Sequence, residues 1–334
     1  MTAPATLRSS SLASTDVDRA LSEWGGFSIE LAEDELPCSE AIAAARDFFA
    51  LPRHAKAPFG IERSRAFRGW SEMNTPRDWR EQLHLGRDGG AAGVGEDGAA
   101  SYLRLSGPNA WPSDPAWRGP ISQYMARTAA LGERILAAAA QALGVGGAAF
   151  EGLPRDGYLV MKLIAYHPQP SPDGSGDRDA TRAGVAGHVD FSWLTLTLQS
   201  GPGLEVRSRD GRWTLIEPQP RALWVHAGEL LELATSGRYR AAPHRVINRQ
   251  HERTRVSIPL FVNPPLTGTV PVFLREGAGA ERRDDDTEHI HRVLDRRLRP
   301  EPFHYGRAEW DRKGLGHWCA RCTPAKDPRR PTLR

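Results

Sequence analysis

The sequence has few cysteines, no long apolar run and little net charge. Three cysteines, Cys38, Cys319 and Cys322, cannot form a disulfide framework for 334 residues, which indicates a reducing compartment, and we take the cytoplasm as the expected location. No apolar stretch reaches the ~18 residues of a membrane-spanning helix, and the N-terminus lacks the apolar segment of a signal peptide. These absences argue against export and membrane insertion.

A concentrated basic surface is missing as well. The chain has 44 Lys and Arg residues against 41 Asp and Glu residues, a formal net charge of +3, and the two signs are interspersed. Nucleic-acid-binding proteins usually concentrate positive charge, so we predict a small-molecule substrate and no nucleic-acid or membrane partner. The 40% hydrophobic and 25% charged residues are typical of a globular protein, which we expect to be a monomer or a weak homodimer.

The first half of the chain is predicted to be mostly helical. Residues 1–16 are rich in Ser, Thr and Ala without periodicity and are expected to be disordered or loosely attached. Residues 17–150 form a helical N-terminal region, which includes DVDRALSEWGGFSIEL, CSEAIAAARDFFALP and an Ala-rich segment that ends at Gly144. That segment places five apolar side chains on one expected buried stripe: Ile121, Met125, Leu131, Ile135 and Leu136.

Residues 151–265 change to short alternating runs separated by Gly, Pro, Asp and Ser, among them YLVMKLIAY, WLTLTLQ, ALWVHAG and RVSIPLFVN. Many short strands with tight turns predict a β-sandwich or barrel. The polar, Gly-rich segment SPDGSGDRDATRAG is expected to be a flexible loop. Residues 266–334 are predicted to be a C-terminal cap, with a helix in DDDTEHIHRVLDRRL, followed by a basic tail.

Two histidines and an aspartate have the spacing of an iron site. His188 and Asp190 are two residues apart, so on or just beyond a strand their side chains share a face. His244 follows in another strand-like segment, APHRVIN. Two imidazoles and one carboxylate suit a facial iron(II) site, which leaves open coordination positions for a chelating cosubstrate and dioxygen.

A third feature strengthens this prediction. Arg255 and Ser257 alternate with apolar residues at the start of RVSIPLFVN and therefore share one face of a strand. A guanidinium group and a hydroxyl about 6.6 Å apart along the strand can bind one carboxylate together. The order of ligand pair, second histidine and Arg-Ser pair makes chance occurrence of all three improbable.

Residues 158–265 resemble the iron(II)/2-oxoglutarate dioxygenase superfamily, in the branch of the plant flavonoid and gibberellin oxygenases and isopenicillin N synthase. The segments that carry the resemblance are GHVDFSWLTLTLQ, GLEVRSRDGRWTLIEPQP, ALWVHAGELLELATSGRYRAAPHRVIN and RTRVSIPLFVNPP. The resemblance implies a mixed α and β fold, with a distorted double-stranded β-helix (jelly-roll) core, a helical N-terminal region and a C-terminal cap. It also implies Fe(II), 2-oxoglutarate and O2 as the cofactor and cosubstrates.

By this resemblance His188, Asp190 and His244 are the metal ligands and the catalytic centre. Arg255, Ser257 and Tyr166 bind the distal carboxylate of 2-oxoglutarate. The implied reaction is hydroxylation of a small organic substrate, often in secondary metabolism, with release of succinate and CO2; desaturation and cyclisation use the same chemistry.

Two alternatives stay open. Ile164 stands where plant enzymes often have Asn, and LIAY with the inserted loop resembles isopenicillin N synthase, an Fe(II) oxidase that does not use 2-oxoglutarate. The other alternative is a non-catalytic barrel that binds a small molecule or a metal.

Further residues are candidates for the substrate pocket or for a second metal site. By their place in the expected fold, five residues are candidates for the substrate pocket: Phe67, Arg68, Trp70, Phe191 and Trp193. A single CxxC at Cys319 and Cys322 falls short of the four ligands of a structural zinc site. Two other histidines near the site, His226 and His251, are expected to be structural or exposed. His289 and His291 share the spacing of the ligand pair, but in the helix expected for EHIHRVL their side chains would point in different directions, so they are set aside as metal ligands.

Overall fold

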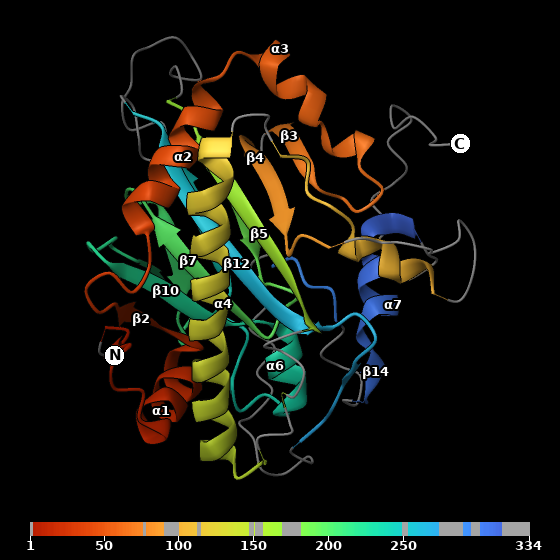
Figure 1. Ribbon diagram of the computed structural model, residues 1–334. Coiled ribbons are helices and arrows are strands. Elements are labelled where there is room, and N and C mark those ends of the chain that lie inside the picture. Colours follow the sequence, from red (N-terminus) through yellow and green to blue (C-terminus); the bar gives the residue numbers. More distant parts are fainter. Residues whose placement is uncertain are drawn as a thin grey trace.

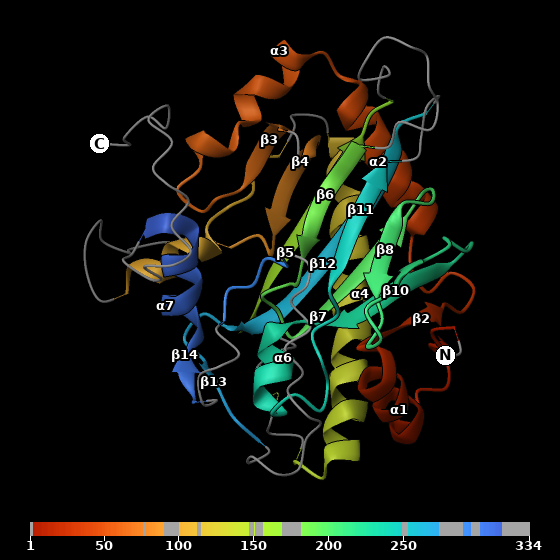
Figure 2. The same ribbon diagram turned by 180° about the vertical axis from the view of Figure 1, so that it is seen from behind.

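Two β-sheets face each other in the computed structural model, and helices cover the outer face of the larger sheet (Figures 1 and 2). The structure describes residues 3–75, 78–89, 100–111, 115–146, 150, 156–168, 182–248, 253–273, 290–294 and 301–315. This is the mixed α and β jelly-roll architecture expected from the sequence, and the fold prediction is confirmed.

The larger sheet has eight strands, and the smaller sheet has four. In spatial order the larger sheet consists of β1 (Thr6–Arg8), β2 (Gly26–Glu30), β10 (Ala222–Ala227), β7 (Leu194–Gln199), β12 (Arg255–Pro265), β5 (Gly157–Tyr166), β4 (Trp79–Gly86) and β3 (Gly69–Asn74). The smaller sheet consists of β6 (Arg182–His188), β11 (His244–Asn248), β8 (Leu204–Arg207) and β9 (Trp213–Leu215). A third pair joins β13 (Thr269–Val270) to β14 (Phe303–His304).

The helices lie mainly outside the sheets. The α-helices are α1 (Ser14–Trp24), α2 (Cys38–Ala50), α3 (Arg53–Lys56), α4 (Pro115–Leu143), α6 (Glu229–Ala234) and α7 (Tyr305–Trp310). Short 3-10 turns are η1 (Ala57–Phe59), η2 (Ile61–Arg63) and η3 (Ser101–Ser106), and η5 (Asp311–Leu315) is a π-helical turn. Among the described residues, none of these helices combines the length and the apolar character that a membrane span requires.

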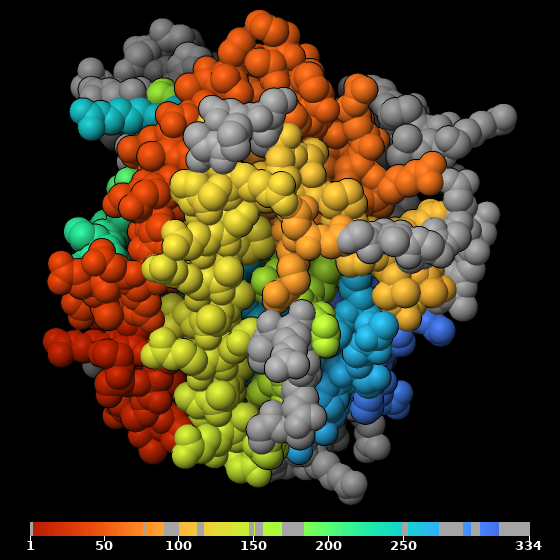
Figure 3. Space-filling model, in the orientation of Figure 1, coloured from red at the N-terminus to blue at the C-terminus, as the bar shows by residue number. Residues whose placement is uncertain are grey.

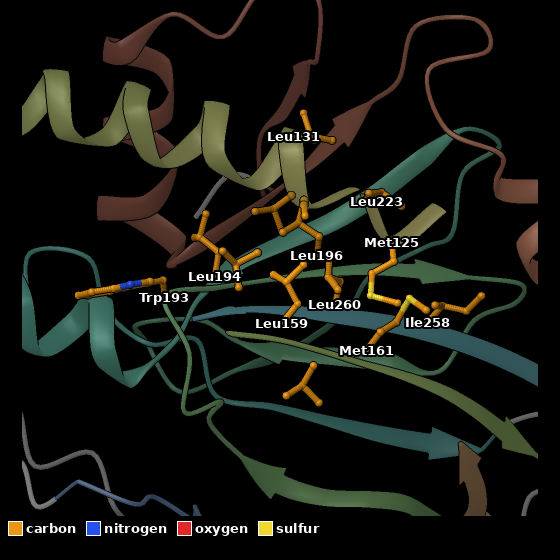
Figure 4. Packing of buried hydrophobic residues seen from close by; sticks show 14 of the residues in the cluster. Met125, Leu131, Leu159, Met161, Trp193, Leu194, Leu196, Leu223, Ile258 and Leu260 are labelled. Carbon is orange, nitrogen blue, oxygen red and sulfur yellow. The ribbon is translucent and has the colours of Figure 1, made fainter. Parts of the chain in front are cut away.

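The long helix α4 packs along the outer face of the larger sheet and lies at the surface in Figure 3. The five apolar residues predicted for its buried stripe are all at most 6% exposed. They meet Leu196 and Leu260, whose side chains point outward from β7 and β12 (Figure 4). The period-two pattern of the strands therefore assigns one sheet face to this core and leaves the other face, with Thr195 and Thr197, for the barrel interior.

The N-terminal residues differ from the prediction. We expected residues 1–16 to be loose, yet β1 pairs in parallel with β2, and Ser9 is buried. The amide of Ser28 donates to the carbonyl of Ala5. The N-terminal segment is therefore attached by backbone hydrogen bonds, which the pattern of side chains in the sequence does not predict. The expected helical region likewise contributes β2, β3 and β4 to the larger sheet. Gly25 separates α1 from β2, because its φ of 70° is left-handed and a Cβ there would lie 2.4 Å from the carbonyl oxygen of Arg240.

The C-terminal prediction is also partly wrong. Within the expected helix DDDTEHIHRVLDRRL, residues 290–294 are described, and they are extended or bent rather than helical. His291 forms an isolated bridge with His188, so tertiary pairing has overridden a helical sequence pattern. The helix of the cap, α7, comes later and packs against η3 and β12.

Arg68 links three segments at one end of the larger sheet. Its guanidinium group is buried and donates to the backbone carbonyls of Leu85 and Leu105 at 3.1 and 3.2 Å, and to that of Leu159 at 3.4 Å. It also lies 5.3 Å from the ring centroid of Tyr158. Arg68 is therefore a structural residue that holds β4, η3 and β5 together.

Replacing this group should destabilise the protein. We expect Arg68→Met to lower the free energy of unfolding by about 2–4 kcal/mol, because three buried carbonyls lose a charged donor. Urea unfolding followed by tryptophan fluorescence would measure the loss. Arg63→Met, at an exposed position, is the matched control and should change stability by less than about 0.5 kcal/mol. Equal unfolding midpoints for the two variants would contradict the role of Arg68.

Candidate active site

A cavity of about 260 Å³ lies between the two sheets. The inward-facing positions of β4, β5, β7 and β12 form one wall, and β6, β8 and β11 form the opposite wall. The C-terminal segment closes one side with residues of α7 and η5. The lining therefore joins residues that are far apart in sequence but share the interior face of one barrel.

The predicted metal ligands converge in this cavity. His188 ends β6, His244 begins β11, and the two residues are directly paired in the smaller sheet. Oδ1 of Asp190 lies 3.5 Å from Nε2 of His188 and 3.7 Å from Nε2 of His244. One ligand atom from each of the three residues lies within 4.8 Å of the other two, which is close enough to share one metal ion.

Backbone carbonyls orient both imidazoles. Nδ1 of His188 lies 2.9 Å from the oxygen of Ala186, and Nδ1 of His244 lies 3.0 Å from the oxygen of Ala242. A carbonyl oxygen only accepts, so each Nδ1 carries the proton and each Nε2 is left with a free lone pair toward the centre. Burial and the nearby His188 lower the pKa of His244 to about 3, which keeps this ligand neutral at physiological pH.

Asp190 is fixed by two residues of the larger sheet. The Thr195 hydroxyl donates to Oδ2 of Asp190 at 2.7 Å, and Nε2 of the buried His226 donates to the same oxygen at 2.8 Å. Burial alone would raise the pKa of Asp190, but the neighbouring imidazoles of His244, His188 and His226 hold it well below its usual range. Oδ1 therefore remains available for a metal.

His226 was expected to be a structural or exposed histidine, and its contact with Asp190 gives it a positioning role at the site. The sequence offered one signal, the alternation in ALWVHAG, which places His226 on the same strand face as Trp224. That pattern could not show which face lies inward or which residue His226 meets 36 positions away.

An arginine with an unpaired nitrogen lies against Tyr166, which lines the cavity. The buried Arg255 donates through Nε to the carbonyl of Gly201 at 3.0 Å and through Nη2 to Oε1 of Gln199 at 2.8 Å. Its Nη1 is buried and has no hydrogen-bond partner among the described residues. The guanidinium carbon lies 4.9 Å from the ring centroid of Tyr166, and Tyr166 and Ser257 line the cavity. This arrangement suits an anionic group that brings its own acceptor oxygens.

Only one of the five expected substrate residues lines the cavity in the described part of the chain. Phe191 does so, and its ring stacks on Tyr305 at 6.0 Å. Trp193 is 2% exposed and packs edge to face against Phe150 in the core (Figure 4). Trp193 thus packs in the core and does not line the cavity, because it lies in the bend before β7, where the alternation of the strand does not apply.

The other three candidates also lie elsewhere. Arg68 has the structural role given above, and Trp70 is buried with its Nε1 donating to Glu81 at 2.7 Å. Phe67 is half-buried beneath Lys313, whose Nζ lies 5.4 Å from the ring centroid. These three side chains do not line the cavity that contains the triad. The sequence did not show that this region joins the larger sheet or which of its side chains lie inside.

Of the remaining histidine and cysteine candidates, His291 is the one that the structure describes. His291 lines the cavity, and its backbone carbonyl accepts from the amide of Val189 at 3.1 Å, although the helix assumed for this segment is absent from residues 290–294. His251, His289, Cys319 and Cys322 lie outside the described residues, as does most of the expected loop SPDGSGDRDATRAG.

Comparison with known proteins agrees with this site. Residues 156–264 match the 2OG-Fe(II) oxygenase superfamily, and residues 4–114 match the N-terminal region of non-haem dioxygenases in morphine synthesis. A 2-oxoglutarate-dependent dioxygenase of Didymella fabae is 30% identical over 250 residues, which are 71% of this chain and 73% of the fungal protein. The chain belongs to the 2OG-Fe(II) oxygenase superfamily.

Further relatives of this oxygenase come from plants and bacteria. Leucoanthocyanidin dioxygenase 1 of Oryza sativa subsp. indica is 29% identical over 313 residues, covering 85% of this chain and 76% of the rice protein. The crystal structure of a 2OG-Fe(II) oxygenase family protein from Caulobacter crescentus superposes with a TM-score of 0.73 at 23% identity, covering 94% of this chain and 99% of that one. The oxygenase is therefore an oxidoreductase that uses Fe(II), 2-oxoglutarate and O2 on a small-molecule substrate.

Removal of the His226 contact should weaken the iron site. We expect His226→Phe to lower the affinity for Fe(II) roughly 10- to 100-fold, the usual effect of losing a group that orients a metal ligand. Anaerobic competition with a chromophoric chelator would measure this affinity. Thr195→Val should act in the same direction, whereas His54→Phe, at an exposed position, should leave the affinity unchanged. Unchanged affinity in both site variants would mean that Asp190 is positioned without them.

Proposed function

We propose that His188, Asp190 and His244 hold the Fe(II) of this oxygenase and that Arg255, Ser257 and Tyr166 bind the distal carboxylate of 2-oxoglutarate. The observation that carries the proposal is the buried, unpartnered Nη1 of Arg255 in a clamp that opens on the same cavity as the triad. A carboxylate at this position would complete the hydrogen bonding of the guanidinium group.

The residues of the triad fit Fe(II) by their chemistry. Two neutral imidazoles and one carboxylate suit Fe(II) and leave positions open on it. When bound, Fe(II) and 2-oxoglutarate supply the oxidising power by activating O2, with succinate and CO2 as products. The protein's own part is to fix Asp190 through Thr195 and His226 and to neutralise the cosubstrate with Arg255.

Hydroxylation of a carbon atom is the proposed reaction, and desaturation and cyclisation are alternatives that need the same ligands. Asp190 keeps its carboxylate, so the metal lacks the extra position that a halogenating relative would need. An isopenicillin N synthase-like oxidase would use Arg255 and Ser257 for its substrate instead and would form no succinate. A non-catalytic barrel would consume no O2.

We also propose that the oxygenase acts in the cytoplasm as a monomer or weak homodimer, on a small organic molecule such as those of secondary metabolism. The low cysteine count supports a reducing compartment. The near-balanced, interspersed charges support the absence of nucleic-acid and membrane partners.

Succinate formation tests the cosubstrate and its clamp together. We expect iron-loaded protein given 2-oxoglutarate and air to form succinate slowly even without substrate, and we expect Arg255→Ala to raise the KM for 2-oxoglutarate roughly 10- to 100-fold by removing a charged donor pair. Arg255→Lys should restore part of the loss. Arg253→Ala, at an exposed position nearby, is the matched control and should match the parent protein.

Two further readings separate the alternatives. Affinity for Fe(II) and the thermal midpoint should be retained in Arg255→Ala, so that the effect is assigned to 2-oxoglutarate rather than to misfolding. If the parent protein forms no succinate and 2-oxoglutarate does not change its visible absorption, the oxidase function is favoured. If iron-loaded protein consumes no O2 under any condition, the non-catalytic function is favoured.

A further inference from the structure

The cavity contains a group of charged residues that the proposed metal and cosubstrate sites leave unused. Arg80 on β4 and Lys162 on β5 line it, together with Glu309 on α7 and Arg312 and Lys313 on η5. Four cations and one carboxylate thus line one partly open cavity. Their pairing shows which of them is available to a ligand.

Three of these cations already have anionic partners. Nη1 of Arg80 lies 2.5 Å from Oδ1 of Asp78 and also donates to the carbonyl of Gly184. Arg312 donates to both oxygens of Glu309 at 2.7 and 2.8 Å, and Nζ of Lys313 lies 3.3 Å from the same carboxylate. The charge of each of these three cations is therefore already shared with a carboxylate.

Lys162 is different, because its ammonium group has no hydrogen-bond or ion-pair partner among the described residues. Its only recorded contact of this kind is with the ring of Phe261, whose centroid lies 5.0 Å from Nζ. Burial, followed by the charge of Arg80, lowers the pKa of Lys162 to about 7. A partly desolvated cation beside other cations is unfavourable, and a bound anion would relieve the cost.

His84 adds a second unused polar atom beside it. His84 lies directly opposite Lys162 in the β4–β5 register, and its Nε2 is buried without a partner in the described structure. Burial, and then Lys162, hold the pKa of His84 well below its usual range, so the ring stays neutral and can donate one hydrogen bond. An acceptor group on a ligand would satisfy both residues at once.

The wall between this position and the metal triad is apolar and aromatic. Phe191 and Phe261 line it, and Phe191 is stacked with Tyr305. Thr195, which holds Asp190, pairs with Phe261 on β12, and β12 pairs in turn with β5. Phe261 pairs with Val160, so Lys162 lies two residues further along β5. Two interstrand steps of about 4.8 Å combined with two residue steps of about 3.3 Å place Lys162 on the order of 12 Å from Thr195, a distance that one small organic molecule can span.

We propose that the substrate is a small carboxylic acid that binds with its carboxylate on Lys162 and its apolar body against Phe191 and Phe261, so that its far end reaches the metal triad. This inference rests on the function proposed above. A carboxylate is favoured over a neutral polar group because only an anion offsets the unpaired ammonium. Among the described residues of the cavity, Lys162 is the cation without an anionic partner, and one carboxylate would match its charge.

Matched acids and amides test the proposal on the anaerobic enzyme loaded with Fe(II) and 2-oxoglutarate. The probes are phenylacetate with phenylacetamide and hexanoate with hexanamide, and calorimetry gives their Kd values. We expect at least one acid to bind roughly tenfold or more tightly than its amide, since a charge-assisted hydrogen bond is lost in the amide. In Lys162→Met this ratio should fall toward one, and Lys162→Arg should keep most of it.

Lys313→Met is the matched control, because it removes a lysine from the same cavity whose charge is already shared with Glu309. It should retain the preference for the acid. The visible absorption of the iron-bound 2-oxoglutarate, recorded in the same samples, should be the same in all variants. Lys162→Met would then have lost substrate binding and nothing else.

The contrary outcomes are distinct. If 2-oxoglutarate binds the iron but no acid is preferred over its amide, or if Lys162→Met keeps the preference, this inference is overturned and the proposed function stands. An acid that displaces 2-oxoglutarate binds at the Arg255 clamp and also overturns it. If 2-oxoglutarate fails to bind the iron, the proposed function fails. The Kd values of the acids and amides for the protein loaded with Fe(II) alone then decide whether Lys162 binds a carboxylate.

Discussion

The carboxylate of Asp190 connects the two sheets, and the rest of the site depends on its orientation. One oxygen is held by Thr195 and His226 from the larger sheet, and the other faces His188 and His244 from the smaller sheet. A buried negative charge needs positive partners, which a divalent metal ion supplies far better than two neutral imidazoles can. The barrel is thus arranged around a charge that is satisfied when the metal is bound.

The interior of this barrel is polar because alternate side chains of each strand point outward to the apolar core and inward to the cavity. On β5 and β12 the outward side chains join the apolar core beneath α4, and the inward ones include Tyr166, Lys162 and Ser257. The helices therefore do more than cover the sheet. By burying its outer face they supply the stability that allows the inner face to carry unpaired polar groups such as Nη1 of Arg255.

The cavity is completed by residues from distant parts of the chain. β4, from the N-terminal half, contributes Arg80 and His84, while α7 and η5, from the C-terminal segment, contribute Glu309, Arg312 and Lys313. The groups proposed to bind the metal and the cosubstrate, in contrast, lie between residues 166 and 257. Such a division fits an enzyme class in which a constant oxidising centre is combined with variable surroundings for the substrate.

The sequence by itself determined the parts of this protein that depend on local periodicity. The spacing of His188 and Asp190, the shared face of Arg255 and Ser257 and the buried stripe of α4 could be predicted, because side-chain direction along a strand or helix is fixed by the backbone. Only the tertiary structure decided which face of β4 and β5 lies inward, that His226 reaches Asp190, and that Arg68 and Trp193 belong to the core. These outcomes depend on strand pairing between residues far apart in sequence, and no local pattern encodes that pairing.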